Sequence, residues 1–133
     1  MSEMAVDTNV LVYLYDESDE RKRSISEELL TLTPVVGAQV ISEYLNVTRR
    51  LLNLPKVDIL TRCTKVFARC AIVPTHQTTL DLALKVLNRY DFQLFDSLIV
   101  AAALEAGCTK LYSEDMQHGL LVENQLRILN PFR

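Results

Sequence analysis

Two aspartates stand where a parallel α/β sheet would bring their side chains to the same edge. Asp7 follows the short apolar run at residues 4–6, and Asp115 comes soon after the run at residues 111–113. Both runs have the length and apolar character of buried central strands. Ligands of open parallel sheets bind beyond the carboxyl ends of the strands, so we expect both carboxylates at that edge.

Two further acids flank apolar helical patterns. Glu43 borders the apolar stripe of a helix expected over about residues 39–52, where its carboxylate can lean toward the sheet edge. Asp96 opens a helix expected over residues 95–106, which is apolar almost all round and therefore buried. Its carboxylate can cap that helix or face the sheet edge, but it cannot lie unpaired in the core.

Carboxylates gathered in this way need a compensating positive charge, because crowded carboxylates repel one another and some take up protons. Mg²⁺ and Mn²⁺ prefer oxygen ligands and keep several waters. Such a site lowers the pKa of a bound water and stabilises charge on a phosphate during in-line displacement. Each acid alone also fits a helix cap, a turn residue or a solvated helix acid. The group, called the four acids below, is Asp7, Glu43, Asp96 and Asp115.

Short apolar runs alternate with helical patterns along the chain, which predicts an α/β fold with a mainly parallel central sheet in a three-layer α/β/α sandwich. Thr8 or Asn9 is expected to cap the first helix. Strands are expected at residues 4–6, 34–37, 71–74 and 110–113, with a possible fifth at 125–129. Helices are expected at about residues 8–15, from within 16–23 to 32, and at 39–52, 58–69, 78–90 and 95–106.

Four segments and the chain's ending together resemble PIN-domain ribonucleases, above all the VapC-like toxin components of bacterial toxin–antitoxin pairs. The segments read AVDTNVLVY, ISEYLNV, FDSLIVAAAL and LYSEDMQHG, with the ending ILNPF. The likeness runs from Val6 to Phe132 and implies that the four acids take the family's acidic, metal-binding positions. Glu114 is an extra acid, which the motif ranks behind Asp115. The implied supporting neighbours are Thr8, Asn9 and Ser97.

The resemblance implies a Mg²⁺- or Mn²⁺-dependent endoribonuclease that hydrolyses RNA phosphodiester bonds with a metal-bound water as nucleophile. In the toxin branch it also implies inhibition by a small antitoxin protein and formation of a homodimer. The complete set of four acids favours an active enzyme. The alternative is a catalytically silent PIN-like scaffold that binds a partner or RNA.

Composition fits this interpretation. The 133 residues, 49% of them apolar, suffice for one domain over residues 1–133 with a single core. The net charge of −3 argues against binding nucleic acid through phosphate contacts alone, but a metal centre needs its own acids. Three cysteines without a C-x-x-C pattern favour reduced thiols. With no signal peptide or membrane-spanning apolar run apparent, we expect a soluble cytoplasmic protein.

Basic residues near Glu43 are the first candidates for contacts with the RNA backbone. Arg49 and Arg50 follow it on the same expected helix. Another basic face carries Arg62, Lys65 and Arg69, and an ordinary solvated surface is the simpler interpretation of both groups. Neither histidine is assigned a catalytic role.

Two other enzyme classes also place an aspartate after their first strand. Phosphatases of the haloacid dehalogenase type want a second aspartate two residues later, where this chain has Asn9. Their phosphate-sensing lysine is not evident either. Receiver domains of signalling pairs need an N-terminal acidic pair and a late lysine motif, which are lacking. Both classes are therefore disfavoured.

Overall fold

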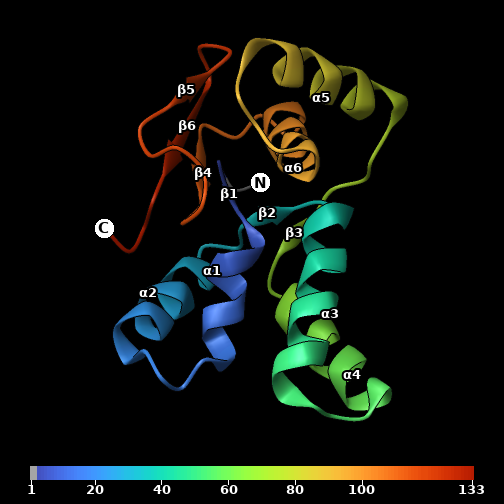
Figure 1. Ribbon diagram of the computed structural model, residues 1–133, viewed down its shortest axis with the longest axis vertical. Helices are drawn as coiled ribbons and strands as arrows, with labels where there is room; N and C mark the ends of the chain where they lie inside the picture. The colour runs from blue at the N-terminus through green and yellow to red at the C-terminus, as the bar shows by residue number, and fades with distance from the viewer. Residues whose placement is uncertain (1–2) are drawn as a thin grey trace.

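The central sheet of the computed structural model, which describes residues 3–133, has six strands in the order β3-β2-β1-β4-β6-β5 (Figure 1). Neighbouring strands are parallel except for β5, which pairs antiparallel with β6. The predicted mainly parallel sheet is therefore confirmed. The strands are β1 (Met4–Val6), β2 (Val35–Val36), β3 (Ala71–Ile72), β4 (Lys110–Tyr112), β5 (Leu121–Val122) and β6 (Leu126–Leu129).

The strand order reverses in the middle of the sheet, between β1 and β4. The chain moves outward from β1 to β2 and β3, then returns to the other side of β1 as β4. In register, Ala5 of β1 pairs with Val35 of β2 on one side and with Leu111 of β4 on the other. In doubly wound α/β sheets, ligands bind outside the carboxyl ends of the strands at such a reversal.

Helices cover both faces of the sheet, as the three-layer prediction required. Right-handed crossovers that run in opposite directions along a parallel sheet lie on opposite faces. The crossover from β1 to β2 carries α1 and α2, and the crossover from β3 back to β4 carries α5 and α6 (Figure 1). The helices are α1 (Thr8–Val12), the 3₁₀ helix η1 (Tyr13–Tyr15), α2 (Glu20–Leu30), α3 (Ala38–Leu52), α4 (Lys56–Phe67), α5 (Gln77–Arg89) and α6 (Leu94–Glu105).

The buried helix α6 is built largely from small and branched apolar residues, including the fully buried Val100 and Ala101. It contacts β2, α3 and α5. A Cβ added to Gly37, which precedes α3, would lie 3.1 Å from the Cβ of Ala102. Glycine therefore allows the start of α3 to approach α6 closely. Gly107 follows the helix with φ of +80°, the left-handed conformation that glycine often adopts just past a helix end.

The structure corrects the expected cap of the first helix, decides between two alternatives for Asp96 and adds a short strand. Asp7, and not Thr8 or Asn9, occupies the N-cap of α1, where its side chain accepts a hydrogen bond from the Thr8 N–H. Gln93 occupies the cap position of α6, so Asp96 lies in the first turn of that helix. The two-residue strand β5 was not predicted, because so short a segment has no recognisable periodicity.

No helix within residues 3–133 combines the length with the apolar character that a membrane crossing requires.

Candidate active site

A cavity of about 680 Å³ opens beside the reversal between β1 and β4. The four acids all line it, although they come from separate parts of the chain. Asp7 joins β1 to α1, Glu43 lies in α3, Asp96 lies in the first turn of α6, and Asp115 follows β4. The juxtaposition expected from the sequence is therefore present. The other polar residues that line this acidic cavity are Thr8, Asn9, Tyr13, Asp16, Asn46, Arg50 and Gln93.

Asp7 is the most deeply placed of the four acids, with only 5% of its surface exposed. Its Oδ1 accepts the Thr8 N–H at 2.7 Å, and its Oδ2 accepts the Ser113 hydroxyl at 2.8 Å. Burial raises the pKa of Asp7 from 3.8 to about 6 although these hydrogen bonds oppose the shift, and the charges of Asp96 and Glu43 add to the rise. The Asp7 carboxylate therefore holds its proton to a higher pH than an exposed aspartate, and a nearby cation would favour its ionised form.

The charges of the remaining acids are linked to one another. Glu43 and Asp96 are half-buried, and burial is the main cause that raises the pKa of each. The charge of Asp96 raises the pKa of Glu43 further, and the charge of Asp115 does the same to Asp96. Among residues 3–133, none of the ion pairs involves these acids. The cavity thus concentrates negative charge without a bonded cationic side chain.

Asn9 connects the carboxylates that follow β1 and β4. Its Nδ2 donates to Asp115 Oδ2 at 3.1 Å and to Asp7 Oδ2 at 3.4 Å. Its Oδ1 accepts the backbone N–H of Glu114 at 3.3 Å. Because only the amide oxygen can accept that N–H, the NH₂ group must face the two acids. Asn9 therefore holds the carboxylates of Asp7 and Asp115 in a fixed relative position.

The other predicted neighbours differ in what they contact. The Thr8 hydroxyl donates to Glu43 Oε2 at 3.5 Å, so Thr8 touches two of the four acids when its N–H is included. The Ser97 hydroxyl instead donates to the backbone carbonyl of Leu94 at 2.6 Å. The structure therefore brings Thr8 to the carboxylates but not the Ser97 hydroxyl.

Ser113 is a site residue that sequence reasoning missed. It is fully buried, and besides donating to Asp7 it accepts the backbone N–H groups of Asp115 and Met116, each at 3.2 Å. It therefore joins Asp7 to the turn that carries Asp115. The available signal was a hydroxyl residue at a strand end, two residues before an acid, a position where serine often bonds to the following backbone.

Glu114 is not among the residues that line the acidic cavity. Its carboxylate forms an ion pair with Lys22 at 2.5 Å and accepts the Tyr13 hydroxyl at 2.6 Å. Burial alone would raise the pKa of Glu114, but the hydrogen bonds from Lys22 and Tyr13 outweigh it and lower that pKa. Asp115 therefore lines the cavity, whereas Glu114 does not.

The predicted basic residues also differ in whether they line the acidic cavity. Arg50 lines the acidic cavity, whereas Arg49 is exposed on α3 and is not among the lining residues. Arg62 packs its guanidinium 5.2 Å from the ring centroid of Tyr15, on another part of the surface. His118 accepts the Asn130 N–H through Nδ1 in a loop outside the cavity. Arg50 is therefore the better placed of the two predicted arginines.

The donors of the acidic cavity suit a hard divalent cation, because carboxylates supply the oxygen ligands that Mg²⁺ and Mn²⁺ prefer. Within the described part of the chain, no three acid, histidine or cysteine side chains are close enough to hold one ion between them. The donor chemistry therefore fits such an ion, while direct ligation by the whole set does not follow from these side-chain positions.

Comparison with known proteins gives a family match over most of the chain. The family model described as the PIN domain matches residues 4–119. No curated protein sequence matches the chain.

Solved structures share this fold at low sequence identity. A toxin–antitoxin complex from Klebsiella pneumoniae is 15% identical, with a TM-score of 0.72 over 96% of this chain and 97% of the other. Mycobacterium tuberculosis VapC20, described as a sarcin-ricin loop cleaving toxin, is 16% identical, with a TM-score of 0.68 over 92% and 98%. VapBC2 from Rickettsia felis, bound to a DNA fragment from its promoter, is 14% identical, with a TM-score of 0.70 over 96% and 98%.

The buried position of Asp7 predicts a pH-dependent stability. Its pKa is 3.8 in an exposed chain and about 6 in the fold, so between these values the folded protein holds a proton that the unfolded chain has lost. The stability from that proton is fully present below about pH 4 and gone once the pH has risen through about 6. Asp7→Asn cannot ionise and so does not lose this contribution as the pH rises. The unfolding free energy of Asp7→Asn minus that of wild type should therefore increase by up to about 3 kcal/mol between about pH 4 and 7.

Urea unfolding in EDTA-containing buffer at several pH values measures this difference. Asp81→Asn, at an exposed position of α5 outside the acidic cavity, is the matched control and should follow the wild type. A constant difference between Asp7→Asn and wild type over this pH range would contradict the prediction.

Proposed function

The chain belongs to the PIN-domain family, and on that premise we propose that it is a metal-dependent endoribonuclease that hydrolyses RNA phosphodiester bonds. The observation that carries the proposal is the acidic cavity, where four acids from separate elements lie together without an ion-pair partner in residues 3–133. Folding tends to avoid buried like charges, because each raises the cost of ionising the next. Their presence at the strand-order reversal supports a site for a cation.

The four acids would hold Mg²⁺ or Mn²⁺. When bound, the ion supplies the positive charge that lowers the pKa of a water and stabilises a phosphate in displacement. Asp7 is oriented for this role by the Thr8 N–H and the Ser113 hydroxyl, and Asn9 holds Asp115 beside it. Some of the carboxylates would act through bound waters, which Mg²⁺ retains readily.

RNA is the substrate that these surroundings favour. Arg50 lines the acidic cavity and can approach a phosphate of the backbone, with Arg49 adjacent on α3. Asn46 and Gln93 add uncharged hydrogen-bonding groups to the same wall. The description of Mycobacterium tuberculosis VapC20 as a sarcin-ricin loop cleaving toxin supports RNA over DNA.

We further propose that the chain is the toxin of a toxin–antitoxin pair in the cytoplasm. Structural neighbours that span nearly the same length include toxin–antitoxin complexes, which supports a small antitoxin as partner. All three cysteines, Cys63, Cys70 and Cys108, are free thiols, and burial raises the pKa of Cys70 and Cys108 to about 11. Unreactive free thiols agree with a reducing compartment.

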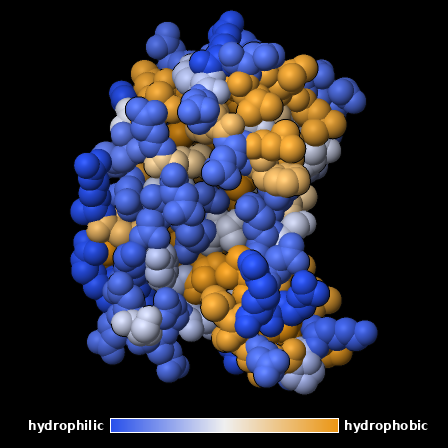
Figure 2. Space-filling model, viewed as in Figure 1, coloured by the Kyte–Doolittle hydropathy of each residue, from blue (hydrophilic) through white to orange (hydrophobic). Residues whose placement is uncertain are grey.

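An exposed apolar surface on α5 and α6 supports a homodimer. Leu80 and Leu84 protrude from α5 with 47% and 62% of their surfaces exposed, and Leu94 and Phe95 protrude from α6. Figure 2 shows apolar residues gathered over this part of the molecule, apart from a second group over α3 and α4. An apolar patch of this kind on a single chain marks an interaction site.

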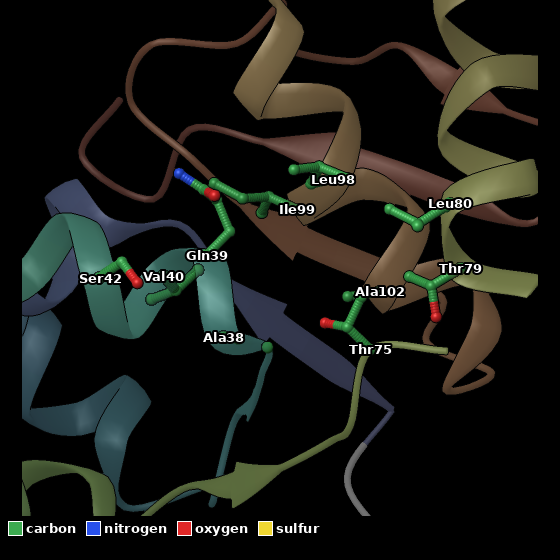
Figure 3. Close-up of a pocket in the computed structure, with 11 residues that line it drawn as sticks. Ala38, Gln39, Val40, Ser42, Thr75, Thr79, Leu80, Leu98, Ile99 and Ala102 are labelled. Atoms are coloured by element: carbon green, nitrogen blue, oxygen red, sulfur yellow. The ribbon is translucent and has the colours of Figure 1, made fainter. Parts of the chain in front are cut away.

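A cavity beside these leucines suggests how two copies would fit together. It measures about 290 Å³ between the start of α3, α5 and α6, and Figure 3 shows Leu80, Leu98 and Ile99 around it. Protruding leucines and an apolar cavity on one face can complement each other across a twofold axis. The second copy would thus insert its own α5 leucines here.

The metal-dependent activity gives the first test. Asp96→Asn and Asp115→Asn should each lower the rate of RNA cleavage by more than about a hundredfold, the most that loss of a supporting group costs a metal site. Cleavage of a mixed RNA pool with Mg²⁺, Mn²⁺ or EDTA measures this, and Asp81→Asn on the exposed side of α5 should keep full activity. A mock preparation from cells that carry the empty vector, purified in parallel, reveals any contaminating nuclease.

Two results would overturn the enzyme proposal. Wild-type cleavage that survives EDTA would refute metal dependence. Full activity in both Asp7→Asn and Asp96→Asn would refute the assignment of the four acids.

Expression in bacteria tests the toxin proposal. Wild-type protein should arrest growth because it degrades RNA, and Asp7→Ala should restore growth at equal protein abundance. Growth curves with immunoblots measure both quantities. Normal growth of cells that accumulate folded wild-type protein would count against the toxin role while leaving nuclease chemistry open to the assay above.

The proposed homodimer predicts that a substitution on its apolar surface weakens association between two copies of the chain. Leu84→Glu should raise the dimer dissociation constant by at least about tenfold, because an unpaired carboxylate at an apolar interface costs more than about 1.4 kcal/mol. Sedimentation equilibrium over a concentration series measures the constant. Leu32→Glu, at an exposed position after α2, is the control and should leave it unchanged. A wild-type chain that stays monomeric throughout would contradict the proposal.

A further inference from the structure

A cluster of charged and aromatic side chains borders the acidic cavity, and one of its members, Tyr13, lines that cavity. Lys22 of α2 donates to Glu114 Oε2 at 2.5 Å and to the Tyr13 hydroxyl at 3.1 Å, and that hydroxyl donates to Glu114 Oε1 at 2.6 Å. The Lys22 ammonium also lies 4.7 Å from the Tyr13 ring centroid and 5.4 Å from that of Phe132. We call Lys22, Tyr13, Glu114 and Phe132 the Lys22 cluster.

The Lys22 cluster is partly shielded from water. The side chains of Lys22 and Glu114 are 25% and 24% exposed, and the rings of Tyr13 and Phe132 pack edge to face with centroids 5.0 Å apart. An ion pair that also has a hydroxyl partner and two rings against its ammonium is more ordered than an isolated surface pair. It can therefore hold the backbone of Glu114 in place.

Side-chain hydrogen bonds hold each of the three residues in the turn after β4. Ser113 bonds inward to Asp7, Glu114 bonds outward to Lys22, and Asp115 accepts from Asn9. The backbone N–H of Glu114 also donates to Asn9 Oδ1, which turns the Asn9 amide toward Asp7 and Asp115. Any displacement of Glu114 would therefore move the Asp115 carboxylate and release Asn9.

We propose that Lys22 is a positioning residue which, through its ion pair with Glu114, sets the place of the Asp115 carboxylate in the acidic cavity. The inference rests on the proposed nuclease function for its kinetic readout. Lys22 does not line the acidic cavity, and its shorter hydrogen bond goes to Glu114 rather than to Tyr13, so its effect on catalysis passes mainly through Glu114 and the turn. The two side chains then act as one unit, and removing either should have the same effect as removing both.

The chain contains a matched cluster that serves as a control. Lys85 contacts Glu123 at 3.1 Å, Arg89 contacts the same carboxylate at 2.9 Å, and the Tyr90 hydroxyl donates to it at 3.3 Å. Lys85, Arg89 and Glu123 do not line the acidic cavity. Lys85→Met thus removes a lysine of the same kind, paired with a glutamate that has a tyrosine partner, without touching the turn after β4.

The experiment compares the full chain with Lys22→Met, Glu114→Gln, their double variant, Lys22→Arg and Lys85→Met. The readouts are kcat and KM for RNA cleavage, Mn²⁺ binding followed by electron paramagnetic resonance of the free ion, and urea unfolding. Lys22→Met should lower kcat and weaken Mn²⁺ binding by about tenfold each, the lower end of the effect when a group that orients a metal ligand is lost. KM for RNA should stay unchanged.

Two comparisons separate positioning from other roles. Glu114→Gln and the double variant should match Lys22→Met within about twofold, because the three remove the same unit. Lys22→Arg should recover most of the loss because its guanidinium can still donate to Glu114, and Lys85→Met should match wild type in kcat and in Mn²⁺ binding.

Other outcomes overturn the inference in distinguishable ways. A higher KM with unchanged kcat in Lys22→Met would make Lys22 a direct RNA contact. Equal losses in Lys85→Met would mean a general effect of removing a surface lysine, and multiplied losses in the double variant would mean that Lys22 and Glu114 act independently. A wild-type chain without metal-dependent cleavage would defeat the proposed function, whereas an active wild type with an unaffected Lys22→Met would defeat only this inference.

Discussion

Repulsion between carboxylates at the reversal of the strand order is the constraint on which the site depends. Burial removes water from Asp7, and the charges of Glu43 and Asp96 act on it across the cavity. In residues 3–133 no lysine or arginine forms an ion pair with any of these acids. Asp7 instead accepts hydrogen bonds from neutral donors, namely the Thr8 N–H, the Ser113 hydroxyl and the Asn9 amide. These stabilise the charge without cancelling it, which leaves it available to a cation.

The remainder of the fold can be understood as support for that arrangement. Strand β1 is paired on both sides, and its partners Val35 and Leu111 are fully buried, so the chain after Val6 leaves a rigid part of the sheet. Asp7 then serves as both the N-cap of α1 and a wall of the acidic cavity. Stability is lost at such functional sites and regained elsewhere, here by the apolar core beneath the strands.

The sequence was most informative where chemistry followed from position along a strand. Asp7 and Asp115 were placed correctly because a short apolar run has only one carboxyl end, and parallel strands bring those ends together. The type and order of the main helices followed from their apolar spacing. The two-residue β5 lacked any such pattern.

The sequence did not predict which side chains form hydrogen bonds or ion pairs with one another. Ser113 and Ser97 are both buried serines near an acid, yet only Ser113 bonds to a carboxylate, while Ser97 bonds to its own helix. The contact between Lys22 and Glu114 joins residues far apart in the chain. Arg49 and Arg50 are neighbours, but the helical rotation between them puts only Arg50 at the cavity.

The distance between two of the acids is set partly by atoms that carry no charge. Gly37 leads into the helix that bears Glu43, and it meets Ala102 on the helix that bears Asp96. A Cβ at this position would lie only 3.1 Å from its neighbour, so a larger residue would require Ala102 to give way by a few tenths of an ångström. The approach of the helix that carries Glu43 to the helix that carries Asp96 therefore depends on a contact between a glycine hydrogen and a methyl group.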